Sequence, residues 1–276
     1  MQFISKAQEK AYAQAMKRKY KAVAFDVDGT LTHFGRFLIP PSLGRVLEEL
    51  PIPIAICSGR RLDYLIGELE FIIHKPNRFA FCENGCIGYK YDYENEKFKK
   101  IYEVPWPSKR ITPNALEAFM KDKFGWHMHI SVRPHSVVAF YPSWFYIFPK
   151  LVRKISNSAA KKIRTLLQAM KIDDIIMAKD SGIGNILMPI QGGKGPAMQA
   201  LAKHLNIPVK SILVIGDQAN PGENDEDFLD GKNGTAFTVG KQTKNVYPLP
   251  VLDSRQRKLT GPFGTEALLK QLFFTK

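Results

Sequence analysis

The sequence lacks the features that define several special classes of protein. Its 276 residues include only three cysteines, an odd and sparse set that excludes a disulfide framework and fits a reducing compartment. No apolar run approaches the roughly 18 residues that a membrane-spanning helix needs. The lysine-rich segment 1–21 has no continuous apolar stretch of the kind found in secretory signals. We therefore expect a cytoplasmic protein with no membrane partner.

Acidic residues are scarce relative to basic ones, with 26 Asp and Glu against 40 Lys and Arg, and the formal net charge is +14. Two segments hold most of this excess. Residues 1–21 contain six basic and one acidic side chain, and residues 145–171 contain seven basic and no acidic ones. We expect both to be helices with solvated basic faces, with contact to a polyanion or a membrane surface as the alternative. Neither segment contains a known nucleic-acid-binding motif, which argues against a nucleic-acid partner.

Short apolar runs, each ending in polar residues and glycine, recur along the chain. They occupy residues 21–25, 52–57, 79–82 and 211–215. Helical spacing of apolar residues separates them, and this order is typical of a doubly wound parallel sheet. In such a sheet, ligands bind at the carboxyl ends of the strands. The four polar endings are therefore expected to meet in one crevice.

The pattern changes between the third run and about residue 188. There it predicts a helix followed by two strands, twice over, which describes a small α+β unit with an antiparallel sheet. The expected helices are 113–123 and 147–170, and the expected strands are 126–132, 136–141, 174–178 and 185–188.

The length fits two modest domains, at about 150 residues per domain. We expect a basic N-terminal helix over residues 1–20. A parallel-sheet domain would follow, built from residues 21–85 and 189–276, and residues 86–188 would form an α+β domain inserted into it.

The string Asp26-Val-Asp-Gly-Thr-Leu31 carries the clearest chemical signal. Asp26 and Asp28 follow a buried strand, and Gly29 permits the turn that lets both carboxylates face the crevice. One carboxylate can attack phosphorus while the other moves a proton.

This string resembles motif I of the haloacid dehalogenase superfamily of phosphohydrolases and phosphomutases. Three further segments resemble the later motifs in the right order. They are Cys57-Ser-Gly-Arg60 for motif II, Gly192-Gly-Lys-Gly-Pro196 for motif III, and Gly216-Asp217 through Asn224-Asp225 for motif IV. The resemblance implies a Rossmann-like α/β core, and the insertion is similar to the type IIB cap of that superfamily.

The resemblance also implies roles for individual residues. Asp26 would be the nucleophile, and Asp28 would protonate the leaving oxygen and later activate water. Mg²⁺ would be held by the side chains of Asp26 and Asp217 and by the carbonyl of Asp28. Ser58 and Lys194 would hold the phosphoryl oxygens. Thr30, Gly59, Asn84, Asn224 and Asp225 are expected to support the site, and Arg60, Arg133 and Lys179 to contact the substrate.

Motif IV departs from the commonest form of the superfamily, in which the second acidic residue follows four positions after the first. Here the step from Asp217 to Asp225 is longer, and Pro221-Gly222 predicts a tight turn between them. We expect Asp225 to orient metal-bound water or to pair with Lys194. In the alternative, Asn220 takes this role and Asn224-Asp225 merely caps the following helix.

Together these observations predict an Mg²⁺-dependent phosphomonoester hydrolase that acts on a small phosphorylated metabolite, namely a sugar or polyol phosphate. A sugar phosphomutase is the first alternative, and it would need a second phosphate site, for which Arg133, Arg153 and Lys179 are the available cations. A nucleic-acid-binding protein that kept the fold and lost the chemistry is the second. The intact motif set argues against it, and a salt-sensitive RNA gel shift without phosphatase activity would favour it.

Overall fold

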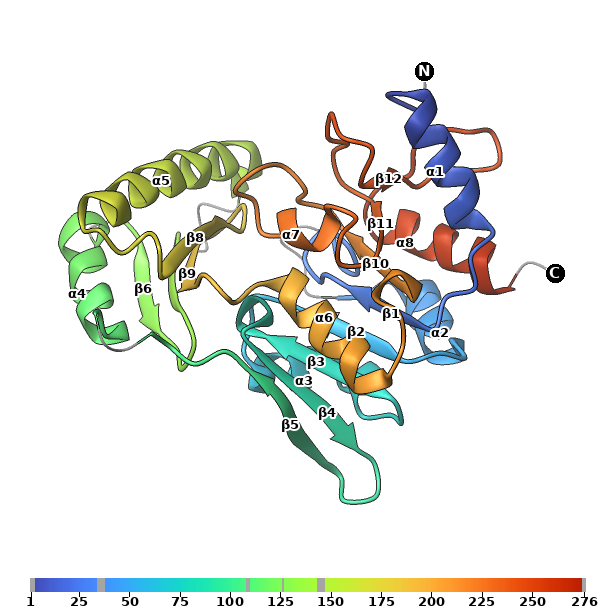
Figure 1. Ribbon diagram of the computed structural model, residues 1–276, viewed down its shortest axis with the longest axis horizontal. Coiled ribbons are helices and arrows are strands. Elements are labelled where there is room, and N and C mark those ends of the chain that lie inside the picture. The colour runs from blue at the N-terminus through green and yellow to red at the C-terminus, as the bar shows by residue number, and fades with distance from the viewer. Residues whose placement is uncertain (1–2, 34–37, 108–109, 126, 143–146, 275–276) are drawn as a thin grey trace.

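The chain forms two β-sheets of unequal size, each covered by helices (Figure 1). The computed structural model describes residues 3–33, 38–107, 110–125, 127–142 and 147–274. Within these residues, one sheet has eight strands in the order β12-β11-β10-β1-β2-β3-β4-β5, and the other has four in the order β6-β7-β9-β8. We call the part built on the four-stranded sheet the smaller unit, and the remainder the large unit.

The eight-stranded sheet is parallel from β12 to β3 and antiparallel at the β4–β5 edge. Its short parallel strands are fully buried, because helices cover both faces of the sheet. The prediction of a doubly wound α/β sheet is confirmed. The strands are β1 (Ala22–Phe25), β2 (Ile54–Cys57), β3 (Arg78–Cys82), β4 (Ile87–Asp92), β5 (Lys97–Glu103), β10 (Ile212–Gly216), β11 (Thr235–Thr238) and β12 (Leu249–Pro250).

Successive side chains of β1 point to opposite faces of this sheet and enter two different cores. Val23 and Phe25 pack in one core with α1, α2, α3 and α8, whereas Ala22 and Ala24 pack in the other with α6 and α7. The predicted N-terminal helix is α1, which packs on the large unit through buried Ala15. The helices are α1 (Lys6–Met16), α2 (Pro41–Glu49), α3 (Leu62–Ile73), α6 (Lys194–Leu205), α7 (Glu226–Leu229) and α8 (Gly261–Leu269).

The smaller unit has the predicted order of a helix and two strands, repeated once, and its sheet is antiparallel. Its two helices pack on one face of the sheet through residues such as Leu116, Ile163 and Leu167. The other face carries Ile186 and Met188. The elements are α4 (Pro113–Phe124), β6 (His129–Val132), β7 (Val137–Phe140), α5 (Pro149–Ala169), β8 (Ile176–Asp180) and β9 (Gly184–Pro189).

The first part of the segment that we assigned to the insertion belongs to the large sheet. β4 pairs with β3 in antiparallel register, with Cys82 opposite Ile87, and β5 pairs with β4. The polar turn after β3 therefore reverses the chain along the same sheet and does not lead out of it. We propose that the smaller unit begins after Glu103. Among the described residues, no helix has both the length and the apolar character needed to cross a bilayer.

Candidate active site

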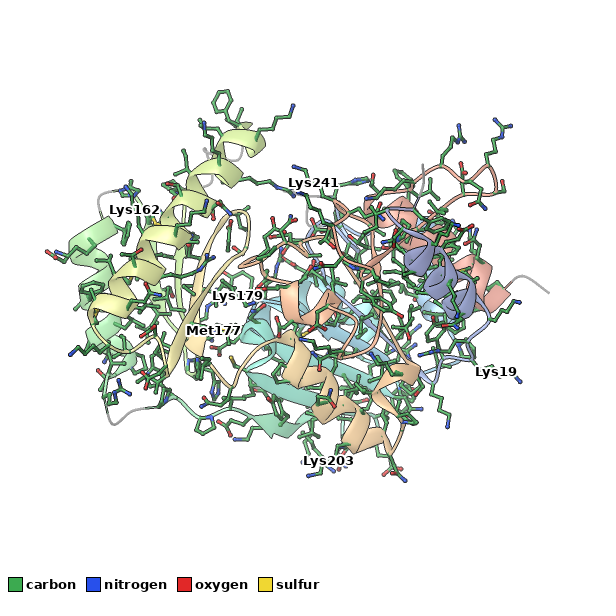
Figure 2. The ribbon with its side chains drawn as sticks, turned by 45° about the horizontal axis from the view of Figure 1, so that its top comes forward. Lys19, Lys162, Met177, Lys179, Lys203 and Lys241 are labelled. Atoms are coloured by element: carbon green, nitrogen blue, oxygen red, sulfur yellow. The ribbon has the colours of Figure 1, made fainter. Side chains whose placement is uncertain are left out.

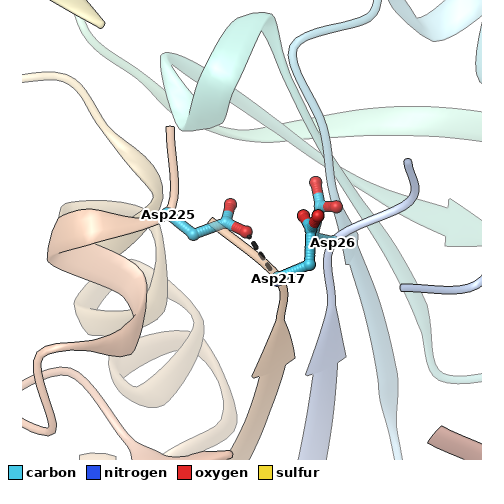
Figure 3. Close-up of side chains that lie close together, drawn as sticks. All are labelled: Asp26, Asp217 and Asp225. Carbon is cyan, nitrogen blue, oxygen red and sulfur yellow. Dashed lines mark hydrogen bonds between the residues drawn. The ribbon is translucent and has the colours of Figure 1, made fainter. Parts of the chain in front are cut away.

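The parallel strands bring the predicted motif residues to one edge of the large sheet. The register pairs Phe25 of β1 with Ile215 of β10, so Asp26 and Asp217 follow the ends of two adjacent strands (Figure 3). Phe25 also pairs with Ile56 of β2, and this places the segment that contains Ser58 on the other side of Asp26. The expected convergence of the polar strand ends is therefore observed.

A buried lysine joins two of the site carboxylates. Lys194, the first residue of α6, is fully buried, and its Nζ lies 2.5 Å from Asp26 Oδ1 and 2.6 Å from Asp225 Oδ1. Burial alone would lower the pKa of this ammonium, but Asp225 and Asp26 outweigh burial and raise it. Lys194 is therefore a permanent positive charge in the site.

The Asp225 carboxylate uses both oxygens inside the site. Oδ1 accepts the bond from Lys194, and Oδ2 accepts hydrogen bonds from the backbone N–H groups of Asp217, at 3.1 Å, and Gln218, at 3.2 Å (Figure 3). Although Asp225 is the residue before α7, its side chain makes no capping hydrogen bond to that helix. The carboxylate thus links the position of Lys194 to the backbone that carries Asp217.

The structure places Asn220, the alternative to Asp225, away from Lys194. The backbone N–H and side-chain amide of Asn220 donate to Glu223 Oε2 at 2.8 and 2.9 Å, which closes the turn at Pro221. Asn224 is buried beside Asp225. Of the two predicted threadings of this loop, the structure has the one that returns Asp225 to the site.

Two carboxylate oxygens at the centre of the site face no donor. Within the part of the chain that the structure describes, neither Asp26 Oδ2 nor Asp217 Oδ1 has a hydrogen-bond partner, although both atoms are buried. Burial is the main cause that raises the pKa of Asp26 to about 7, and burial also raises the pKa of Asp217. The repulsion between neighbouring carboxylates acts in the same direction.

This group of carboxylates fits a divalent cation. Oxygens of Asp26, Asp217 and Asp225 lie within 4.8 Å of one another, and the buried Lys194 ammonium contacts Asp26 and Asp225. Carboxylate oxygens are the ligands that a hard divalent ion prefers, and two of these buried oxygens lack hydrogen-bond donors among the described residues. Because both oxygens of Asp225 are already bonded, Asp26 and Asp217 are the side chains best able to hold the ion.

Gly29 is required for this geometry. Its φ is +90°, and a Cβ at this position would lie 2.6 Å from Asp217 Oδ2. A side chain here would therefore strain the backbone and displace the Asp217 carboxylate. Thr30 anchors the same turn, because its carbonyl accepts a hydrogen bond from Thr265 Oγ1 at 2.8 Å.

Asp28 is held by an arginine. The Arg60 guanidinium donates to both carboxylate oxygens, with Nη2 2.7 Å from Oδ1 and Nε 3.3 Å from Oδ2, and it also donates to Glu68. We expected Arg60 to contact the substrate, and in the structure it contacts these two acidic residues. The side chain of Asp28 remains 29% exposed, so the bound carboxylate still borders the crevice.

Ser58 and Asn84 line the next strand ends. Ser58 is buried, and its carbonyl accepts the Asn84 N–H at 2.8 Å. Asn84 has a φ of +58°, and its side-chain amide donates to Met188 Sδ at 3.5 Å. This contact joins the site edge to the smaller unit.

Two arginines of the smaller unit reach the site. The Arg133 guanidinium donates to the carbonyl of Gly59, next to Ser58. Arg153 Nη2 lies 3.6 Å from Asp217 Oδ2, and the Arg153 side chain is 41% exposed. The smaller unit therefore borders the crevice with positive charge.

Lys179 is engaged with acidic residues of the large unit. Its Nζ lies 2.8 Å from Glu226 Oε2 and 3.7 Å from Asp227 Oδ1. We expected Lys179 to contact the substrate, and in the structure its ammonium forms an ion pair across the two units.

Two acidic residues near the site were missed by sequence analysis. Glu83 Oε2 accepts hydrogen bonds from the His135 N–H, at 3.0 Å, and from Ser136 Oγ, at 2.8 Å, and so ties the smaller unit to the end of β3. Asp227 Oδ2 accepts the Gly195 N–H at 2.7 Å in the first turn of α6. Glu83 could have been identified from the sequence, because it directly follows a buried strand.

Comparison with known proteins gives a consistent set of relatives. The family model of sucrose-6F-phosphate phosphohydrolase matches residues 147–254. A phosphoglycolate phosphatase of Archaeoglobus fulgidus is 26% identical over 213 residues, which cover 73% of this chain and 78% of that protein.

Two solved structures have a similar fold. The truncated, IMP-bound IMP-nucleotidase of Plasmodium falciparum superposes with a TM-score of 0.63 at 19% identity, over 96% of this chain and 72% of that one. A haloacid dehalogenase-like hydrolase of B. subtilis superposes with a TM-score of 0.58 at 13% identity, over 82% of this chain and 91% of that one. Both structures share the fold of this chain.

Proposed function

We propose that the chain is a phosphoric monoester hydrolase of the haloacid dehalogenase superfamily, and that it hydrolyses a sugar or polyol phosphate through an aspartyl-phosphate at Asp26, with Mg²⁺ as cofactor. The observation that carries this proposal is the pair of buried oxygens without donors, Asp26 Oδ2 and Asp217 Oδ1, beside the ammonium of Lys194. A nucleophile, a cation site and a fixed positive charge then lie together at one edge of the sheet.

Asp26 and Asp28 divide the reaction between them. An oxygen of Asp26 attacks phosphorus, and the bond between phosphorus and the leaving oxygen breaks as Asp28 gives that oxygen a proton. Asp28 then takes a proton from water, which attacks the phosphorus of the aspartyl-phosphate and frees both phosphate and the Asp26 carboxylate. Arg60 holds Asp28 in place for both proton transfers.

The remaining residues stabilise charge on the phosphoryl group. Lys194, oriented by Asp225, and the hydroxyl of Ser58 bind its oxygens. Asp26 and Asp217, together with the carbonyl of Asp28, would hold Mg²⁺, which when bound offsets the repulsion between a carboxylate and a phosphate dianion.

The smaller unit supports a small metabolite as the substrate. It lies against the sheet edge beside Ser58, where Arg133 bonds the Gly59 carbonyl, and a covered site of this kind favours a small substrate over a folded macromolecule. The matched sucrose-6F-phosphate phosphohydrolase model spans α5 and the Asp217–Asp225 loop, so a sugar phosphate is the substrate class that this match favours. The three cysteines are free and buried, in keeping with a cytoplasmic location.

The test is a screen for phosphate release from a panel of phosphorylated metabolites, with Mg²⁺ or with a chelator, using Asp26→Asn as the inactive control. We expect Mg²⁺-dependent release, with sugar and polyol phosphates giving the highest kcat/KM. A preference for phosphoglycolate or IMP would refute the proposed substrate class. Isomerisation of a hexose phosphate without phosphate release would instead identify a phosphomutase.

A further inference from the structure

The loop that connects β10 to α7 touches the smaller unit at its tip. We call residues 218–223 the docking loop. The backbone N–H of Asp180, the last residue of β8, donates to the Gly222 carbonyl at 2.9 Å, and Gln218 Nε2 donates to the Ser181 carbonyl at 3.2 Å. The extra residues of motif IV thus leave the active site and meet the other unit.

An arginine of α5 clamps this contact. Arg164 donates through Nε to the Ala178 carbonyl of β8 and through Nη2 to the Gly222 carbonyl of the docking loop, both at 3.2 Å. Gly222 has a φ of +80°, and a Cβ at this position would overlap the guanidinium. The Pro-Gly turn therefore provides both the bend and the space that Arg164 needs.

Lys179 makes a second clamp from β8. Its ammonium lies 2.8 Å from Glu226 Oε2, and the same oxygen accepts the Gly222 N–H at 2.8 Å. The Lys179 side chain is only 11% exposed. It lies between β8 and the large unit, whereas Lys162 of α5 lies near the outer side of the smaller unit (Figure 2).

The inner end of the same loop holds the catalytic lysine. Asp225 donates its backbone N–H to the Gln218 carbonyl at 3.0 Å, which ties the end of the loop to its beginning. The Asp225 side chain in turn fixes Lys194 and the Asp217 N–H. A displacement of the loop tip therefore moves Asp225, and with it the ammonium that faces the phosphoryl group.

We propose that Arg164 and Lys179 are positioning residues, and that docking of the smaller unit on residues 218–223 sets the position of Asp225 and so of Lys194. This inference rests on the proposed phosphatase function. It gives the longer motif IV a role, because the added residues form the surface that the smaller unit contacts. Catalysis is then fastest only when the smaller unit is docked.

The competing explanation is that Arg164 and Lys179 bind the substrate directly. The two explanations differ in kinetics, because loss of a binding contact raises KM, whereas loss of a positioning contact lowers kcat. They also differ in the loop itself. Its backbone N–H groups are protected by hydrogen bonds such as that from Gly222 to Glu226 Oε2, and these bonds should open more often when the smaller unit no longer holds the loop tip.

The experiment compares Arg164→Ala, Arg164→Lys and Lys179→Met with Lys161→Ala, a matched control that removes an exposed lysine of the same helix. Hydrogen exchange of the 217–226 amides and steady-state kinetics with an Mg²⁺ titration are measured on each full-length protein. We expect about tenfold faster exchange in 217–226 and a kcat lowered by about 10- to 100-fold in Arg164→Ala and Lys179→Met, with KM little changed. Arg164→Lys should retain part of the activity, and the control should match the wild type.

Unchanged exchange in 217–226 for both Arg164→Ala and Lys179→Met would overturn the inference, as would a raised KM at constant kcat. The exchange measurement needs no substrate, so it tests docking even if the wild type releases no phosphate, the outcome that would defeat the proposed function instead. Thermal unfolding checks that each variant is folded. If an alanine variant is not, the exchange and kcat of Arg164→Lys decide.

Discussion

The two sides of the crevice are built differently. On the side of the large sheet, Lys194 and Asp225 are almost fully buried, and each charge lies within hydrogen-bond distance of its partner. On the side of the smaller unit, Arg153 is 41% exposed and lies 3.6 Å from Asp217. Breaking a buried pair leaves an uncompensated charge and costs about 3–5 kcal/mol, whereas an exposed pair contributes about 0–1 kcal/mol. We therefore expect the charges at the sheet edge to be held more rigidly than the Arg153 guanidinium.

The largest expected effect is at the nucleophile on the sheet side. Asp26→Asn should abolish phosphate release, because an amide neither attacks phosphorus well nor binds Mg²⁺ as an anion. Steady-state phosphate release measures this, and thermal unfolding confirms that the variant is folded. Activity near that of the wild type would show that Asp26 is not the nucleophile.

Asp28→Asn should have the next largest effect. Loss of the general acid and base lowers kcat by about 10²–10⁴-fold, while Mg²⁺ activation stays largely intact because the metal contact is through the carbonyl. Arg60→Ala, which frees the Asp28 carboxylate, should lower kcat less. If Arg60→Ala lowered kcat as much as Asp28→Asn, Arg60 would do more than orient Asp28.

Variants in motif IV distinguish the residues at the sheet edge from those in the docking loop. We expect Asp217→Ala to impair Mg²⁺-supported activity most, Asp225→Ala less, and Asn220→Ala only mildly, because Asn220 bonds Glu223 and not Lys194. Titration of Mg²⁺ against rate in the three variants gives the order. A severe defect in Asn220→Ala beside a healthy Asp225→Ala would reverse the roles of the two residues.

The contact of Arg133 with the sheet edge should give a weaker kinetic effect. Arg133→Ala removes one hydrogen bond to the Gly59 carbonyl and should raise KM by about 2- to 10-fold with little change in kcat. A fall in kcat comparable to that of Asp28→Asn would place Arg133 among the groups that act on the phosphoryl group, and the contrast between the two sides would fail.

The smallest expected effect is on thermal stability without metal. The pKa of Asp26 is raised from its ordinary value of 3.8 to about 7 in the folded state. Between these two pH values the folded protein binds more protons than the unfolded chain, so stability falls as pH rises toward and through 7. With a chelator present, Tm should be a few degrees lower at pH 8 than at pH 6, and Mg²⁺ should recover the loss. In Asp26→Asn this pH dependence should shrink. A metal-free Tm that rises over the same range would contradict the burial of these charges.

The parts that could be predicted from the sequence are those encoded over short distances. Four apolar runs followed by polar residues identified the strand ends that carry Asp26, Ser58 and Asp217, because a buried parallel strand has no polar positions of its own. The structure brings these ends together at one edge.

The strand pairing of β4 and β5 and the partners of Arg60 and Lys179 could not be predicted, because they depend on contacts between distant parts of the sequence. Strand β5 exposes many of its side chains, and β4 and β5 extend the large sheet as an antiparallel pair. The sequence of these two strands therefore looked like part of the inserted unit. Arg60 meets Asp28 across 32 residues, and Lys179 meets Glu226 across 47. The acidic partner of a basic residue cannot be identified from the sequence at such separations. For this reason Arg60 and Lys179 were both expected to contact the substrate.

The pairing of β1 with β10 has a consequence for how the protein is made. Asp26 and Lys194 are 168 residues apart, yet they meet beside this pairing. During synthesis, the smaller unit, whose elements are contiguous in sequence, can fold while β10 is still untranslated, since local contacts form faster than distant ones. At that stage β1 of the nascent chain can pair with β2, but its other edge lacks β10. Pairing of β10 with β1 also completes the proposed catalytic group, so we expect a chain that ends before β10 to release no phosphate.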